Sequence, residues 1–94
     1  MSGHRRKKLP VSEPLPRTAL APICPLLAAV IREQRTRRGW SKNELARYSG
    51  LSQPMIRYIE TGTRIPTVDS LARLSRALGV DVSRLMVQAE RRLR

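Results

Sequence analysis

The amino-acid sequence predicts an all-α fold, a compact cluster of five short helices. Apolar residues recur every three or four positions along several segments, as they do on the buried face of a helix. Glycines and helix-capping residues stand where those segments would end and begin. No segment shows the apolar–polar alternation that is typical of a half-buried strand. The 94-residue chain has one Trp, two Tyr and no Phe, so its core should be aliphatic.

The first helix should begin near Pro25 and end near Arg38. Proline is favoured in the first turn of a helix because an N–H group there has no intrahelical partner. Gly39 follows where helices commonly stop. The apolar stripe of this helix consists of Leu26, Leu27, Val30 and Ile31.

The second helix should follow Trp40, which we expect at the edge of the core. Ser41 can cap this helix, and Glu44 three residues later completes a capping-box pattern. Gly50 comes next, where a tight turn requires a left-handed backbone that glycine adopts without a Cβ clash. The pattern therefore predicts a short helix followed by a glycine turn.

The third helix should span about residues 52–61. Ser52 can cap it, and Pro54 falls in its first turn, where a missing N–H costs little. Ile56 and Ile59 are three apart and can share a buried face. The other side chains of this helix then point outward, and what they contact determines the function.

Two further helices complete the predicted cluster. Thr67 can cap the fourth helix, and Gly79 ends it. Asp81 or Ser83 can cap the fifth. The apolar positions of these helices are Val68, Leu71, Leu74 and Leu78, then Leu85 and Met86.

The chain divides into a flexible, basic and proline-rich tail at 1–24, a folded domain at 25–88 and a basic end at 89–94. Of the net charge of +12, five basic residues less Glu13 give the tail +4. The other 14 basic and 6 acidic residues give +8, so the folded part also favours an anionic partner. The tail is either a solvated extension or an arm that follows DNA phosphates or a minor groove.

Several function classes are disfavoured. His4 and Cys24 are the only His and Cys and lie far apart, which leaves neither a zinc site nor a nucleophile–base pair. No glycine-rich phosphate loop is visible. The basic start and the apolar run after it look like a secretory signal, but Pro22 and Pro25 interrupt that run, which is too short to span a membrane. We predict no enzyme activity, metal, cofactor or membrane association.

The stretch from about Leu26 to Leu85 resembles the helix-turn-helix domain of the phage repressor and Cro type, the XRE family. The similarity rests on RRGWS before the second helix, ELA within it, the G-L-S turn, the I-x-x-I-E-x-G run and LARLSRALGV. The resemblance implies that 25–88 is a lambda-repressor-like DNA-binding domain. Its third helix would enter the major groove, and its second would lie across the DNA backbone.

The resemblance also implies which outward residues contact DNA. Gln53 can bond bidentately to adenine, and Arg57 can read guanine or bind a phosphate. Tyr58 can read a base or pack on a sugar or a thymine methyl, whereas Pro54 can make only apolar contacts. The implied phosphate contacts are Lys42, Ser52, Thr63 and Arg64.

Glu60 would repel phosphate, and the resemblance pairs it instead with Arg35 of the first helix, as a structural ion pair. A dimer surface should involve the fifth helix and the segment before it, because apolar residues there have little else to bury against. Leu85 and Met86 could also simply close the core. The residues expected at the dimer surface are Val80, Val82, Leu85, Met86 and Val87.

The leading hypothesis is a cytoplasmic, nucleoid-associated transcriptional regulator that binds a pseudo-palindromic operator in double-stranded DNA as a homodimer. A second hypothesis is an antitoxin or another interaction module that also binds DNA and has a toxin or another regulator as its partner. A third is binding to nucleic acid through charge alone, without sequence preference. The operator, the sign of regulation and the genomic context do not follow from the sequence.

Overall fold

The computed structural model describes residues 23–93, and five helices account for most of them. The predicted tail at 1–24 lies outside the described residues, apart from Ile23 and Cys24. No strand occurs between residues 23 and 93, which confirms the all-α class. The helices are α1 (Ile23–Arg37), α2 (Lys42–Ser49), α3 (Gln53–Glu60), α4 (Val68–Leu78) and α5 (Val82–Arg91).

Local signals set the boundaries of α2. The Ser41 hydroxyl accepts a hydrogen bond from the Glu44 N–H (3.1 Å), and the Glu44 carboxylate accepts one from the Ser41 N–H (2.8 Å). This reciprocal capping box satisfies two N–H groups that an uncapped helix leaves unpaired. Gly50 ends the helix in the left-handed conformation, with φ of 75°. The sequence therefore predicted both ends of α2 correctly.

The helices α3 and α4 are capped in the same way. The Ser52 hydroxyl accepts a hydrogen bond from the Met55 N–H, and the Thr67 hydroxyl accepts one from the Ser70 N–H. Asp81 occupies the N-cap position of α5, but its side chain makes no capping hydrogen bond. That helix therefore owes its start to packing more than to its cap.

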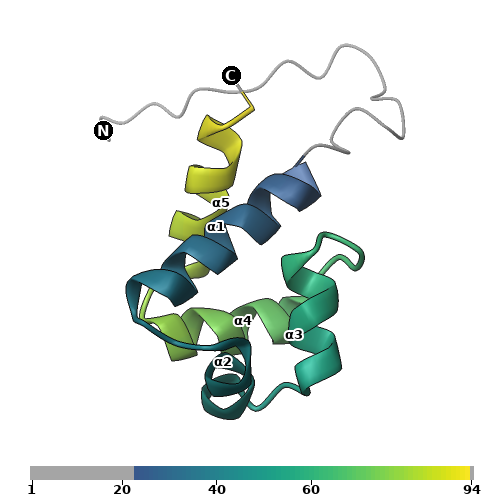
Figure 1. The fold of residues 1–94 in the computed structure, drawn as a ribbon. Helices are drawn as coiled ribbons and strands as arrows, with labels where there is room; N and C mark the ends of the chain where they lie inside the picture. The colour runs from purple at the N-terminus through teal and green to yellow at the C-terminus, as the bar shows by residue number, and fades with distance from the viewer. Residues whose placement is uncertain (1–22, 94) are drawn as a thin grey trace.

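The core is aliphatic and draws on all five helices. Figure 1 shows α1 and α5 side by side at one end of the molecule, with α2, α3 and α4 at the other. Among the helices described, α1 packs against α5 and α3, whereas α2 packs against α3 and α4. The core residues are Leu27, Val30, Ile31, Leu45, Ala46, Ile56, Ile59, Leu74, Leu78, Leu85 and Ala89. None of the aromatic side chains belongs to this buried set.

The predicted core position of Val68 is wrong, because this side chain is 86% exposed. Val68 precedes Leu74 by six residues, which places it about 240° away around a helix of 3.6 residues per turn. Ser70 precedes Leu74 by four residues and shares its face, so Ser70 is buried instead. Its hydroxyl is bonded to that of Thr67 at 3.0 Å, which satisfies the polar group.

Two helices extend beyond the predicted bounds. The first helix begins at Ile23 rather than Pro25. The predicted boundary after residue 88 falls inside α5, which continues to Arg91. Ala89 lies in the core, so α1 and α5 pack along more of their length than the sequence pattern indicated. No helix within residues 23–93 has both the length and the apolar character needed to cross a membrane.

Candidate nucleic-acid interface

The short helix α3 has one buried face and one exposed face. Ile56 and Ile59 are buried in the core, and Glu60 at the end of the helix is only 1% exposed. The residues on the opposite face are exposed, and they are the four that the sequence resemblance assigned to bases: Gln53, Pro54, Arg57 and Tyr58. The helix therefore presents polar side chains to solvent on a surface that the core holds in place.

A network of arginines anchors the end of α3 to α1. The Arg35 guanidinium donates to both oxygens of the Glu60 carboxylate, from Nε at 2.8 Å and from Nη2 at 3.1 Å. The remaining Nη1 of Arg35 donates to the Trp40 carbonyl at 2.8 Å. Arg32 donates to the Glu60 backbone carbonyl. One guanidinium thus joins α1, the segment before α2 and the end of α3.

The loop after α3 folds back against the helix. The Tyr58 carbonyl accepts hydrogen bonds from the backbone N–H groups of Thr63 (3.0 Å) and Arg64 (3.2 Å). The Arg64 guanidinium lies 5.1 Å from the centroid of the Tyr58 ring. The Thr63 hydroxyl lies 2.7 Å from that of Thr61. The structure therefore brings Thr63 and Arg64 next to Tyr58 at the carboxyl-terminal end of α3.

The other two proposed phosphate contacts stand at helix amino termini. Lys42 is the first residue of α2, and Ser52 is the N-cap of α3; both are exposed. The Ser52 hydroxyl accepts a bond from Met55, which leaves its hydrogen available for donation to an anion. The unpaired N–H groups of a helix amino terminus favour the same anion. The proposed phosphate contacts therefore flank α3 at both of its ends.

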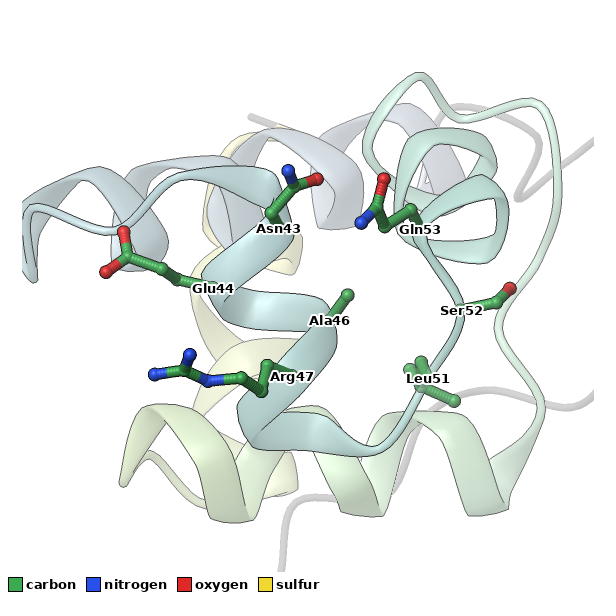
Figure 2. Close-up of a pocket in the computed structure, with 7 residues that line it drawn as sticks. All are labelled: Asn43, Glu44, Ala46, Arg47, Leu51, Ser52 and Gln53. Carbon is green, nitrogen blue, oxygen red and sulfur yellow. The ribbon is translucent and has the colours of Figure 1, made fainter.

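A groove of about 430 Å³ separates α2 from α3. Figure 2 shows the amides of Asn43 and Gln53 directed toward one another across its opening, with Ala46 between them on α2. Arg47 lies one turn after Asn43 on the same helix. Asn43 and Arg47 line this groove, but they were not among the site residues predicted from the sequence. Their spacing of four residues, on the face that also carries Ala46, was the signal available for finding them.

The predicted dimer residues fall into two groups. Leu85 is completely buried, so it belongs to the core and its assignment to a dimer surface is wrong. It faces inward because α5 packs against α1 and α4. Val80, Val82 and Met86 are half-buried, and Val87 is 43% exposed. Val87 is therefore the most exposed of the five predicted dimer residues, and it lies among the polar side chains of Ser83, Arg84 and Gln88.

In the part of the chain that the structure describes, no three His, Cys, Asp or Glu side chains come together as metal ligands would. The α2–α3 groove is open, and it is lined by the apolar side chains of Ala46 and Leu51 together with amide, hydroxyl and charged groups that can form hydrogen bonds.

A family model described as Helix-turn-helix matches residues 31–85, which include α2, α3 and most of the core. The chain belongs to this family. The helix-turn-helix match confirms the resemblance that the sequence motifs indicated. The matched range contains α2 and α3, which are joined by the turn at Gly50.

Individual relatives of this helix-turn-helix chain are regulators. An uncharacterized HTH-type transcriptional regulator of Mycobacterium tuberculosis is 39% identical over 59 residues, which are 63% of this chain and 42% of that protein. The chain thus spans less than half the length of this relative.

Two solved structures show the same fold. The restriction-modification controller protein C.AhdI from Aeromonas hydrophila is 29% identical, with a TM-score of 0.64 over 69% of this chain and 97% of that one. The clp gene regulator ClgR from C. glutamicum is 27% identical, with a TM-score of 0.71 over 87% and 97%.

Proposed function

We propose that this protein is a transcriptional regulator that binds double-stranded DNA by placing α3 in the major groove. The observation that carries the proposal is the two-sided character of α3. Its buried side is fixed by the core and by the Arg35–Glu60 pair, while Gln53, Arg57 and Tyr58 lie exposed on the other. Membership of the helix-turn-helix family supports it, because the second helix of that motif reads base edges.

Each exposed residue of α3 has a distinct role in this proposal. The Gln53 amide has a donor and an acceptor that match N6 and N7 of adenine, and the Arg57 guanidinium matches O6 and N7 of guanine. Tyr58 is held by Arg64 at the edge of the surface and packs on a sugar or a thymine methyl. Pro54 has no N–H and contributes only an apolar contact.

Contacts to phosphates fix the register of α3 in the groove. Lys42 and Ser52 approach one DNA strand with the amino termini of their helices, and Thr63 and Arg64 approach the backbone at the other end of α3. Such contacts supply affinity and orientation without reading sequence. The same DNA target implies that the protein works in the cytoplasm, at the nucleoid.

The functional unit in this proposal is a homodimer that binds two half-sites about 34 Å apart. Two copies meet through α5, around Val87 and the half-buried Val80, Val82 and Met86. Analytical ultracentrifugation tests this with Val87→Glu, which should yield monomers. Val68→Glu is the control, since Val68 is an exposed valine (86%, against 43% for Val87) that lies on α4, and this variant should leave the dimer intact. A dimer that survives Val87→Glu would refute the α5 surface.

Selection from a random duplex library tests the proposed reading of sequence. The wild-type protein should enrich one motif, and Gln53→Ala and Arg57→Ala should each lose preference at a defined base pair, at a cost of about 1–3 kcal/mol. Lys42→Ala should weaken all sequences alike and lower the salt slope by about one unit. If no motif is enriched, the protein binds nucleic acid through charge alone, and the proposal of sequence-specific binding fails.

A further inference from the structure

The three aromatic side chains of this protein share an uncommon environment. None belongs to the buried core, and each ring has an arginine guanidinium nearby. The distances from guanidinium carbon to ring centroid are 5.3 Å for Arg38 and Trp40, 5.2 Å for Arg47 and Tyr48, and 5.1 Å for Arg64 and Tyr58. Tyr58 is part of the proposed DNA surface. The other two rings form a separate cluster.

Trp40 and Tyr48 stack on each other, with ring centroids 4.6 Å apart and an angle of 26° between the planes. Trp40 packs against the core with part of its surface, whereas Tyr48 is 52% exposed. The Arg47 guanidinium also donates to the Tyr48 hydroxyl at 3.4 Å. The stack therefore displays aromatic surface at the end of α2 without filling the core.

More arginines border this stack across the groove between α2 and α4. Tyr48 lines that groove together with Arg73 and Arg76 of α4. Arg73 is partly neutralised, because its Nε bonds to Asp69 at 2.9 Å. Among residues 23–93, Arg47 and Arg76 take part in no ion pair.

Arg38 keeps its charge too, because its acceptor is a backbone carbonyl, that of Leu78. We call the set of Arg38, Trp40, Tyr48, Arg73 and Arg76 the arginine–aromatic patch; Arg47 is not counted in it, because Arg47 lines the α2–α3 groove.

We propose that the arginine–aromatic patch is a docking surface for an acidic segment of a partner protein. Its arginines outnumber its acidic neighbours, so the patch attracts carboxylates, which guanidinium groups bind with short, charge-assisted hydrogen bonds. Tryptophan, tyrosine and arginine are also the residues that contribute most to the binding energy of protein interfaces. The aromatic stack holds these groups in place before a partner arrives, which reduces the entropy lost on docking.

The geometry favours a protein partner over a nucleic acid strand. Base stacking requires an open ring face. Trp40 stacks on the Tyr48 ring and the Arg47 guanidinium lies over the ring as well, so a base that stacked on this ring would compete with these two side chains.

The patch is also distinct from the surface that would read DNA. The α2–α4 groove and the α2–α3 groove have no lining residue in common. The two grooves can therefore be occupied independently, which lets the protein hold DNA and a partner protein together.

The test uses the full chain and a synthetic peptide of alternating glutamate and leucine. Trp40 is the only tryptophan, so its fluorescence reports binding at the patch directly. The wild-type protein should bind the peptide with a change in Trp40 emission, and the variant Arg73→Gln/Arg76→Gln, whose two arginines line the α2–α4 groove, should bind about tenfold more weakly. The matched control is Arg37→Gln/Arg91→Gln, which removes the same charge from another groove and should change the affinity less than about twofold.

Duplex DNA binding is measured with the same variants, so failure of the patch and failure of the DNA proposal are distinguishable. The inference is supported if the Arg73 and Arg76 changes weaken peptide binding alone. It is overturned if the wild-type protein does not bind the peptide, or if both double variants weaken peptide binding equally, which would mean general charge attraction. Loss of duplex binding with Arg73→Gln/Arg76→Gln also overturns it, as does tighter binding of a single-stranded oligonucleotide with quenching of Trp40.

Discussion

Substitution of Glu60 by alanine should destabilise this domain more than any change on its surface. Glu60 is 1% exposed and its partner Arg35 is 13% exposed, so the pair is almost removed from water. Glu60→Ala leaves the Arg35 guanidinium with only the Trp40 carbonyl as an acceptor. Removing one partner from a buried ion pair costs about 3–5 kcal/mol, because the remaining charge stays desolvated and uncompensated.

The size of this loss is measurable by urea unfolding and by heating. A domain of this length has a total stability of about 5–15 kcal/mol, so the variant should lose a large fraction of it. The midpoint of thermal unfolding should fall by roughly 12–40 °C, at about 4–8 °C for each kcal/mol. DNA affinity should fall only as far as the unfolded fraction grows, because Glu60 is not in the contact surface.

Two controls separate the buried pair from a general effect of lost charge. Glu90→Ala removes an exposed carboxylate from α5 and should change stability by less than about 0.5 kcal/mol. The double variant Arg35→Leu/Glu60→Leu should be more stable than Glu60→Ala, because no buried charge is left without a partner. The reasoning is refuted if Glu60→Ala costs less than about 1 kcal/mol, or if the double variant is the less stable of the two.

Three further predictions concern stability. Gly50→Ala should lower the free energy of unfolding by about 1–2 kcal/mol, because φ at Gly50 is 75° and an alanine Cβ is strained there. Urea unfolding measures this loss, and an unchanged stability would contradict the left-handed cap. Val68→Ser should leave the free energy of unfolding unchanged because Val68 is exposed, whereas Leu74→Ala should lower it by about 2–5 kcal/mol because Leu74 is buried. Equal losses in the two variants would contradict the assigned buried face of α4. The hydrogen bond from Arg92 holds the pKa of Glu33 below its usual value of 4.5, so Glu33 stabilises the fold above that pH and less as pH falls through its lowered pKa. Glu33→Gln should therefore lower stability slightly at neutral pH, and the deficit measured by unfolding at several pH values should vanish in acid, whereas a deficit that persists there would exclude the charge as its cause.

The sequence by itself determined the five helices and most of their ends. The signals are local, because a cap such as Ser41 with Glu44 involves groups only three residues apart, and a left-handed turn at Gly50 depends on that residue alone. The motif from α2 to the end of α3 also determined the family, since its order and spacing are visible without coordinates. The ion pair of Arg35 and Glu60 was implied by that resemblance and occurs in the structure.

Only the tertiary structure decided whether Val68 of α4 and Leu85 of α5 are covered or exposed. The apolar spacing of α4 predicted that Val68 lies in the core, and the apolar character of α5 predicted that Leu85 lies on a dimer surface. In the packed structure Val68 is exposed and Leu85 is buried, so both predictions were wrong. Burial is a property of the angle at which two helices meet, and a single helix does not encode that angle.

For the same reason, the arginines that surround Trp40 and Tyr48 were not foreseen. Arg38 and Arg47 are neighbours of these rings in the chain, but the stack of Trp40 on Tyr48 and the arginines of α4 beside it form only when the helices pack.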